Sequence, residues 1–350
     1  MKILVTGGAG FIGSCFVRLV SQEHAAEVLN LDKLTYAGNL ENLASLDGSS
    51  RYRFVKGDIC DADLVDRLFD EWKPDAVVHF AAESHVDRSI FSPLPVLETN
   101  VRGTFTLLEA ARAHRLARFV HVSTDEVYGS LEPPLDADET FPLNPSSPYS
   151  ASKAGSDLLA LAYFRTYKLP VVVTRASNNY GPYQFPEKLI PLMISNALED
   201  RPLPVYGDGM QVRDWLYVED HCRAILALLE KGRDGEIYNI GGNRSLPNLE
   251  VVRKILTAAG KGENLIRYVT DRPGHDRRYA LSSEKLIRET GWQPSTQFER
   301  GLSETVEWYR SNPEWVRRVK SGEYQTYYAR NYGNRTAELS GLPATALRTE

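Results

Sequence analysis

The fold is decided near the amino terminus by Lys2-Ile-Leu-Val-Thr-Gly-Gly-Ala-Gly-Phe-Ile-Gly13. Its first five residues predict a short buried strand, its glycines a sharp turn, and residues 14–21 an amphipathic helix. Glycine allows the backbone to turn tightly and to approach a pyrophosphate, which would lie on the amino terminus of the helix. The order of these elements predicts a Rossmann-type dinucleotide site, with a purely structural turn as the alternative.

A carboxylate follows the second predicted strand. This strand covers residues 27–31, and Asp32 lies 19 residues after Gly13. At this spacing a carboxylate accepts hydrogen bonds from the adenosine ribose hydroxyls and repels a 2′-phosphate. The sequence therefore favours NAD over NADP, and the adjacent Lys33 weakens that preference.

Further strands and helices alternate along the first half of the chain. Apolar strands are predicted over 53–56, 76–80, 119–123 and 169–175, and a helix over 98–113. Asp58 has two interpretations, a contact to the adenine amino group or the cap of a helix beginning near Asp61. The alternation predicts an α/β fold of the Rossmann type, with a doubly wound parallel sheet and right-handed crossovers.

The residues that carry chemistry flank the strand over 119–123. Thr124, Asp125 and Glu126 follow it directly, and Tyr149 and Lys153 open a helix that Ser147-Pro148 would cap. Ligands of such sheets bind beyond the carboxyl ends of the strands, and residues four apart share one face of a helix. In isolation the acids would be loop carboxylates and the other two an ordinary helix pair. Their joint placement favours a catalytic site.

Composition excludes several classes of protein. A net charge of -5 and a pI of about 5.9 lack the basic excess that binding to nucleic acid or to a membrane surface requires. The chain has no apolar run near the ~20 residues of a membrane helix and no room for a signal peptide before Ile3. Its 3 cysteines and 7 histidines show no metal-ligand spacing. We expect a cytoplasmic protein without a catalytic metal.

The second half of the chain predicts a smaller mixed α/β lobe that binds the substrate. Segments 176–210 and 236–330 carry more proline, glycine and arginine, with short strands such as 236–240. Residues 1–175, together with about 211–235, would form the NAD-binding Rossmann domain. The polar tail at 331–350 is expected to be loosely ordered.

Six blocks of sequence together resemble one family. They are Thr6–Gly13 (TGxxGxxG), Ala81–Ser89, Ser123–Gly129, Tyr149–Lys153 (YxxxK), Ser177–Tyr183 and Arg272–Tyr279. With the βα pattern between them, they resemble the extended short-chain dehydrogenases/reductases that act on nucleotide sugars, and among these the 4,6-dehydratases. The resemblance covers about residues 1–310. Its Thr-Asp-Glu triplet discriminates most, because sugar epimerases and decarboxylases of the superfamily have other residues at the two acidic positions.

The implied reaction removes water across C5 and C6 of a hexose. The C5 proton becomes acidic only after C4 is oxidised to a ketone, so the enzyme needs two bases, an acid and a hydride acceptor. The resemblance implies that Tyr149, helped by Thr124 and Lys153, deprotonates the C4 hydroxyl, that Glu126 removes the C5 proton and that Asp125 protonates the C6 hydroxyl. We expect Lys153 and the oxidised nicotinamide to lower the pKa of Tyr149, and Glu126 to raise that of Asp125.

The resemblance also implies two sets of ligand contacts. For NAD they are Gly7, Gly10, Phe11, Ile12, Gly13, Asp32, Lys33, Thr35, Asp58, Ile59, Phe80, Ala81, Ala82, Ser84, Thr99, Tyr149, Lys153 and Asn179. For the nucleotide sugar, expected to be dTDP-glucose, they are Ser84, His85, Thr124, Asn178, Lys188, Leu189, Pro204, Tyr206, Arg213, Asn248, Arg272 and His275. The alternatives are a surface salt bridge for either arginine and a packed core position for His85.

The sequence leaves other functions open and also indicates an assembly state. The alternatives are a UDP- or CDP-hexose dehydratase, a 4-epimerase that uses the same tyrosine and lysine, and a non-catalytic NAD-binding module. Helices over about 97–113 and 152–167 have apolar or small residues around more of their circumference than one buried face needs. In extended family members such a pair forms a four-helix bundle, so a homodimer is expected, with core packing as the alternative.

Overall fold

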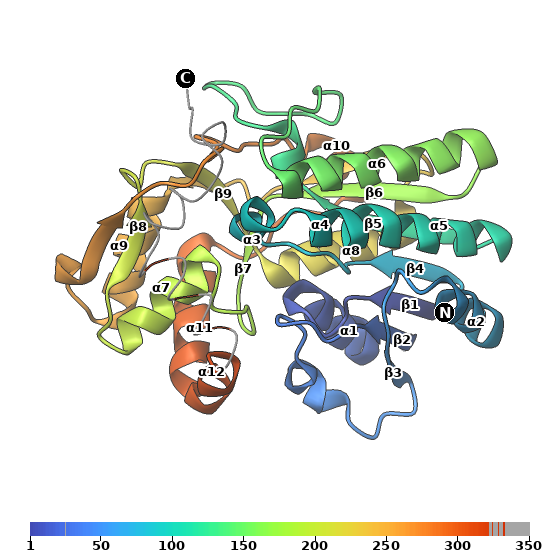
Figure 1. The fold of residues 1–350 in the computed structure, drawn as a ribbon, viewed down its shortest axis with the longest axis horizontal. Coiled ribbons are helices and arrows are strands. Elements are labelled where there is room, and N and C mark those ends of the chain that lie inside the picture. Colours follow the sequence, from blue (N-terminus) through green and yellow to red (C-terminus); the bar gives the residue numbers. More distant parts are fainter. Residues whose placement is uncertain (25, 322–323, 325–327, 329–331, 333–350) are drawn as a thin grey trace.

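A doubly wound parallel sheet dominates the computed structural model, which describes residues 1–24, 26–321, 324, 328 and 332. Within this part of the chain, seven strands form the main sheet in the order β10-β6-β5-β4-β1-β2-β3 (Figure 1). They are β1 (Lys2–Thr6), β2 (Glu27–Asp32), β3 (Tyr52–Lys56), β4 (Ala76–His79), β5 (Arg118–Thr124), β6 (Val171–Ala176) and β10 (Ile237–Ile240). The predicted fold class is confirmed.

Helices cover both faces of this sheet. The longer ones are α1 (Phe11–Glu23), α2 (Ala62–Trp72), α5 (Thr104–Ala113), α6 (Pro148–Tyr167) and α8 (Val218–Lys231). Shorter ones are η1 (Leu40–Leu46), α3 (Val86–Phe91), α4 (Leu94–Val96), η2 (Leu97–Gly103), η3 (Asp125–Tyr128) and α10 (Glu284–Thr290). The helix predicted over 98–113 therefore begins as the π-helical turn η2 before it continues as α5.

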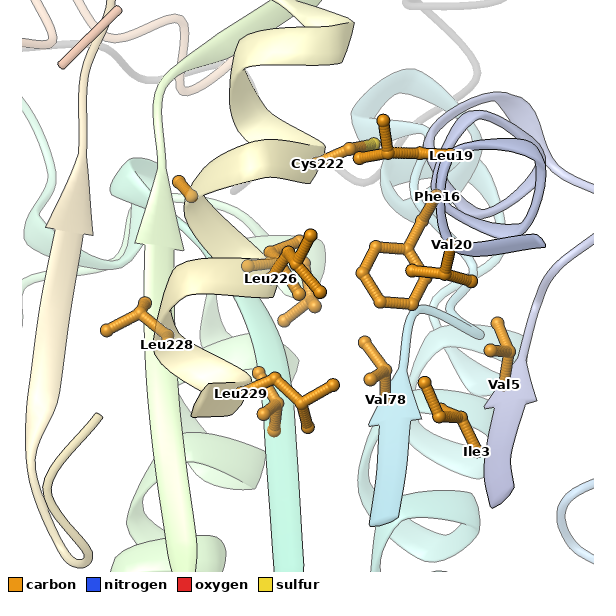
Figure 2. Packing of buried hydrophobic residues seen from close by; sticks show 14 of the residues in the cluster. Ile3, Val5, Phe16, Leu19, Val20, Val78, Cys222, Leu226, Leu228 and Leu229 are labelled. Atoms are coloured by element: carbon orange, nitrogen blue, oxygen red, sulfur yellow. The ribbon is translucent and has the colours of Figure 1, made fainter. Parts of the chain in front are cut away.

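The strands are apolar throughout because both of their faces are buried. Ile3 and Val78 belong to a cluster with α1 and α8, whereas Leu4 faces the opposite cluster, to which α2, α5 and α6 contribute. Figure 2 shows Phe16 of α1 and Leu226 of α8 pointing toward each other above the strands that carry Ile3 and Val78. This two-sided packing is typical of a Rossmann sheet and leaves only the strand ends for chemistry.

A smaller mixed α/β part lies beside the carboxyl edge of the sheet (Figure 1). It contains a three-stranded sheet of β7 (Asn178–Tyr180), β9 (Val212–Tyr217) and β11 (Ser245–Pro247), and a two-stranded sheet of β8 (Leu203–Tyr206) and β12 (Ile266–Val269). Its helices are α7 (Leu189–Leu198), α9 (Asn248–Ala259), η4 (Glu263–Leu265), α11 (Phe298–Ser311) and α12 (Pro313–Val319). Their apolar side chains form a separate cluster.

Two strands differ from the predicted division of the chain. β10 was expected in the smaller lobe, but it pairs with β6 at the edge of the main sheet. β9 falls in the range 211–235 assigned to the Rossmann domain, but it pairs with β7 and β11. The apolar composition of a strand indicates that the strand is buried, but it does not indicate which sheet the strand joins. This is why β9 and β10 were each assigned to the wrong part of the molecule. The rest of the division stays a prediction.

Two further sequence expectations concern the whole chain. The expected loose tail at 331–350 lies outside the described residues, apart from Tyr332. Among the helices that the structure describes, none combines the length and the apolar character that a membrane crossing requires.

Candidate active site

The glycine loop between β1 and α1 is built for close backbone contact. Gly7 has a φ of 72°, and a Cβ there would lie 2.6 Å from the backbone nitrogen of Ala81. A Cβ on Gly13 would lie 2.2 Å from the carbonyl oxygen of Gly7. Gly10 is the N-cap of α1 and has no side chain to cap the first turn. This cradle at a helix amino terminus fits the pyrophosphate of a dinucleotide.

Asp32, at the end of β2, holds two loops together. Its Oδ2 accepts a hydrogen bond from the backbone N–H of Ala9 at 2.9 Å, and its Oδ1 accepts one from Leu34 at 2.8 Å. Burial raises the pKa of this carboxyl, and the two backbone hydrogen bonds oppose the rise. Its contact to a ribose remains a prediction.

Asp58 does not cap the following helix. The N-cap of α2 is Asp61, whose side chain accepts a hydrogen bond from the backbone N–H of Leu64 at 3.0 Å. Asp58 instead accepts one from Cys60 N–H and pairs with Lys33 at 2.7 Å. The cap interpretation was wrong, because the chain makes a tight turn at Asp58 before the helix begins. The adenine contact stays a prediction.

The first turn of α6 carries the tyrosine and the lysine. Ser147 is the N-cap, and a reciprocal capping box with Ser150 fixes where the helix begins, with Pro148 at its first position. Tyr149 and Lys153 are both buried. The Lys153 Nζ donates a hydrogen bond to the carbonyl oxygen of Val122 on β5 at 2.8 Å.

Burial acts on both of these groups. It lowers the pKa of Lys153 to about 8, against an opposing effect of the Asp157 carboxylate. Burial also raises the pKa of Tyr149, as do the Glu126 and Asp125 carboxylates, while a hydrogen bond with Thr124 opposes the rise. In the protein alone, desolvation therefore dominates the pKa of Tyr149. The expected lowering, which also involves the oxidised nicotinamide, stays a prediction.

The two acids stand at the carboxyl end of β5. Thr124 is the N-cap of η3 and accepts a hydrogen bond from the Glu126 backbone N–H at 3.3 Å, so the threonine and not an acid caps this turn. The Thr124 hydroxyl donates to Asp125 Oδ1 at 3.3 Å. Burial, followed by the neighbouring Glu126, raises the pKa of Asp125 well above its ordinary value. This shift favours the protonated form of Asp125, which is the form that a general acid needs.

Arg213 is held deep in the smaller part of the molecule. It is buried, and its guanidinium donates to the carbonyl oxygens of Val212 at 2.7 Å and Asp276 at 2.9 Å. Its Cζ lies 4.1 Å from the centroid of the Tyr279 ring. A surface salt bridge is therefore excluded for Arg213. Arg272 does form an ion pair, with Asp87 at 3.5 Å, but inside the molecule.

A single cavity of about 420 Å³ is lined by every site residue that the sequence predicted. It runs from the glycine loop, past Tyr149 and Asp125, to Arg213 and His275. Among the described residues, the buried oxygen atoms on its wall that lack a hydrogen-bond partner include Asn178 Oδ1, Asn248 Oδ1 and Asp125 Oδ2. An unpaired buried polar atom costs about 1–3 kcal/mol, so these atoms fit a site that a polar ligand completes.

His85 is packed in the interior and also lies on the cavity wall, and its contact to the sugar stays a prediction. It caps α3 through a hydrogen bond from the Arg88 backbone N–H at 3.5 Å. Burial, reinforced by Lys188, lowers its pKa to about 3, so the imidazole is neutral.

The cavity wall also includes residues that sequence reasoning missed. Glu187 is buried there and accepts a hydrogen bond from the Tyr36 hydroxyl at 2.9 Å. Burial raises the pKa of Glu187 to about 7. His221 Nδ1 lies 2.9 Å from Asn179 Oδ1. The position of Glu187 directly before the predicted Lys188 was an available signal, whereas His221 had none.

The fold and the site together define a class of protein. A tyrosine and a lysine one helical turn apart, at the carboxyl edge of a Rossmann sheet, are the arrangement of the extended short-chain dehydrogenases/reductases. Within that class, the model of the GDP-mannose 4,6 dehydratase family matches residues 4–305. The chain belongs to this family.

Curated relatives match nearly the whole chain. A dTDP-glucose 4,6-dehydratase from Salmonella typhimurium is 53% identical over 360 aligned positions, covering 96% of this chain and 100% of the relative. One from Xanthomonas campestris pv. campestris is 56% identical, covering 92% and 97%.

Solved structures share the fold at two levels of similarity. DesIV, a dTDP-glucose 4,6-dehydratase from Streptomyces venezuelae with NAD bound, is 54% identical and has a TM-score of 0.89, covering 91% of this chain and 100% of that one. A UDP-glucose 4-epimerase from Thermus thermophilus, also with NAD, is 34% identical with a TM-score of 0.84, covering 89% and 100%. The fold alone thus does not separate dehydratase from epimerase.

Replacing Gly13 by alanine tests the predicted phosphate cradle. The added Cβ would collide with the Gly7 carbonyl oxygen at 2.2 Å, forcing the loop to shift. Such overpacking costs about 1–3 kcal/mol, which corresponds to about 5- to 150-fold in dinucleotide affinity. The measurement is the dinucleotide released from purified protein by acid. Gly155→Ala is the control, because its Cβ would have 3.8 Å to the nearest side chain and should leave the content unchanged. Equal content in both variants would contradict the assignment.

Proposed function

We propose that this chain converts dTDP-glucose to dTDP-4-keto-6-deoxyglucose and water, as a dTDP-glucose 4,6-dehydratase with NAD recycled in each turnover. The observation that carries this proposal is the Asp125–Glu126 pair beside Tyr149 in one cavity, in a chain that is 53% and 56% identical to two curated dehydratases. A 4-epimerase needs no such acid pair. The activity is that of a hydro-lyase.

Three buried side chains take part in the first step, the oxidation at C4. Tyr149 accepts the proton of the C4 hydroxyl, and the Thr124 hydroxyl that bonds to it orients the phenol. Lys153 adds positive charge from one helical turn away. NAD, when bound, supplies the hydride acceptor, the positive charge that favours a phenolate, and the hydride that returns to C6.

The acid pair carries the elimination. Glu126 removes the C5 proton, which the C4 ketone has made acidic, and Asp125 gives its proton to the departing C6 hydroxyl. Burial and the neighbouring Glu126 raise the pKa of Asp125, and this favours the protonated form that donates. Glu126 then returns its proton to C5. One carboxyl thus serves as acid while its neighbour serves as base, a division that burial sets up.

NAD and the nucleotide sugar occupy different parts of the cavity. The glycine loop and the strand ends from Asp32 to Thr99 hold NAD, and the residues from Asn178 to His275 hold the nucleotide sugar. The buried Arg213 and Arg272 are placed to bind its diphosphate. The main sheet, with residues 1–175, is accordingly the cofactor domain, and the smaller part is the substrate lobe.

Two further features belong to the proposal. Leu97, Phe105 and Leu158 are 50%, 46% and 57% exposed on the neighbouring helices η2, α5 and α6, which supports a homodimer joined through these helices. Three free thiols, at Cys15, Cys60 and Cys222, fit the reducing cytoplasm.

Proton NMR of the sugar tests the reaction directly. Purified protein incubated with dTDP-glucose, without added NAD, should convert the C6 hydroxymethylene signal into a C6 methyl doublet, because the cofactor is resident and recycled. UDP-glucose in a parallel sample ranks the bases, and slower conversion is expected. A galactose product would show epimerisation and overturn the proposal.

Replacing Asp125 by asparagine separates the steps. Without the acid, elimination should slow by about 10²- to 10⁴-fold in single-turnover measurements, while C4 oxidation, followed as reduced nicotinamide, changes little. In the wild type, elimination should also decline as alkaline pH removes the Asp125 proton, since only the protonated form donates. The variant has no such proton, so its slow elimination should lack that decline. Equal loss of both steps would contradict the role of Asp125.

Replacing Leu158 by aspartate tests the dimer. A charge on this exposed apolar face should raise the dimer dissociation constant by about tenfold or more in sedimentation equilibrium. Leu135→Asp is the control, because Leu135 is 53% exposed and lies in a loop, not on any of these helices. A monomeric wild type, or the same dissociation constant in both variants, would rule out this interface.

A further inference from the structure

Asp87 is a buried carboxylate that the proposed reaction does not use. It is the second residue of α3, 3% exposed, and it follows β4 of the main sheet. It lines the same cavity as Tyr206 and Arg272, which come from the smaller part of the molecule. A carboxylate buried where an anionic diphosphate is expected needs a physical reason.

Each oxygen of Asp87 has its own partner in the smaller part. Tyr206 donates its hydroxyl hydrogen to Asp87 Oδ2 at 2.8 Å, and Arg272 Nη1 lies 3.5 Å from Asp87 Oδ1. Tyr206 ends β8 and Arg272 follows β12, the two strands that pair in parallel from Leu203 and Ile266 onward. The Asp87 carboxylate, on the main-sheet side, therefore contacts one residue at the end of β8 and one residue shortly after β12.

The Arg272 guanidinium faces the Asp87 carboxylate through Nη1, whereas its Nε donor has a different environment. Its side chain is 15% exposed. Burial lowers its pKa, but the Asp87 carboxylate, together with smaller effects of Tyr279, Glu126 and Tyr206, raises it overall. Its Nε is a buried donor without a hydrogen-bond partner among the described residues. Asp87 thus fixes the Nη1 end of the guanidinium, while the Nε donor stays ready for a ligand oxygen.

Other basic side chains line this end of the cavity. Lys188, Arg213 and His275 line it with Arg272, and repulsion from Arg272 acts together with burial to lower the pKa of His275 to about 4. Unlike Arg213, which two carbonyl groups hold, Arg272 makes its ion pair across the two parts of the molecule. Without Asp87, the mutual repulsion of these groups would displace it.

We propose that Asp87 is a positioning residue for the nucleotide diphosphate: it holds the Arg272 guanidinium and the Tyr206 ring where they bind the substrate. The inference rests on the proposed function. Side chains fixed before binding do not lose their freedom on binding, and this raises affinity. Asp87 does not touch the reacting atoms of the sugar, so its effect falls on binding and not on the chemical steps.

The test is Asp87→Asn in the NAD-loaded enzyme. The variant keeps the size of the side chain and an acceptor for Tyr206 but removes the charge that holds Arg272. Calorimetry with dTDP should show binding weakened by roughly tenfold or more, because two side chains lose their fixed positions. The KM for dTDP-glucose should rise in parallel, while kcat stays close to that of the wild type. Unchanged or tighter dTDP binding, or a loss confined to kcat, would overturn the proposal.

Tyr206→Phe is the matched second variant. It keeps the ring and the Asp87–Arg272 pair and removes the hydroxyl, with its 2.8 Å hydrogen bond to Asp87 and its 3.4 Å contact to the Tyr332 hydroxyl. Binding of dTDP should therefore weaken less than in Asp87→Asn. In the double variant the losses should be less than additive, because both act through one carboxylate. Additive losses would contradict a shared role. If Asp87→Asn does not fold, Tyr206→Phe still decides, since dTDP binding equal to that of the wild type would refute the positioning role.

Failure of the proposed dehydratase function and failure of the positioning role of Asp87 give different experimental results. A wild type that binds dTDP but forms no 6-deoxysugar would refute the dehydratase assignment and leave the binding test of Asp87 intact. A wild type that dehydrates dTDP-glucose, with an Asp87→Asn variant of the same KM and dTDP affinity, would refute only the positioning role.

Discussion

Parallel strand pairing is the constraint on which the whole site depends. β1, β4, β5 and β6 run in the same direction in adjacent positions, so their carboxyl ends meet at one edge of the sheet. The pairing of Thr124 with Ala176 brings the acid pair next to the segment that continues into the smaller part of the molecule. Segments far apart in the sequence become neighbours without any loop having to reach across the fold. The one long cavity follows from this edge.

Burial is the second organising influence, and it acts on acids and bases in opposite directions. It raises the pKa of Asp125 and lowers that of Lys153 to about 8, so both groups move toward neutrality. A site enclosed in this way can hold a carboxylic acid that still has its proton. The same enclosure works against a tyrosine that must lose one. The positive charge of a bound nicotinamide opposes this rise in the pKa of Tyr149.

Local patterns in the sequence predicted most of the fold and the placement of the site. Apolar runs marked the strands, and Ser147-Pro148 marked the start of α6, because these signals are local. Contacts between distant residues left no such signal. The bond from Tyr36 to Glu187 spans 151 residues, and that from Tyr206 to Asp87 spans 119. The sheet that β10 joins was missed for the same reason, since strand pairing is decided by packing and not by composition.

The two hydrogen bonds of Asp32 limit how the cofactor preference of this chain can evolve. A carboxylate at this position disfavours a 2′-phosphate, and an obvious route to NADP use is to replace it. In this protein the same carboxylate accepts the backbone N–H groups of Ala9 and Leu34, and so holds the glycine loop against its neighbour. A substitution that admits the phosphate also loosens the pyrophosphate cradle. Exchange of cofactor therefore requires at least a second change that restores this support.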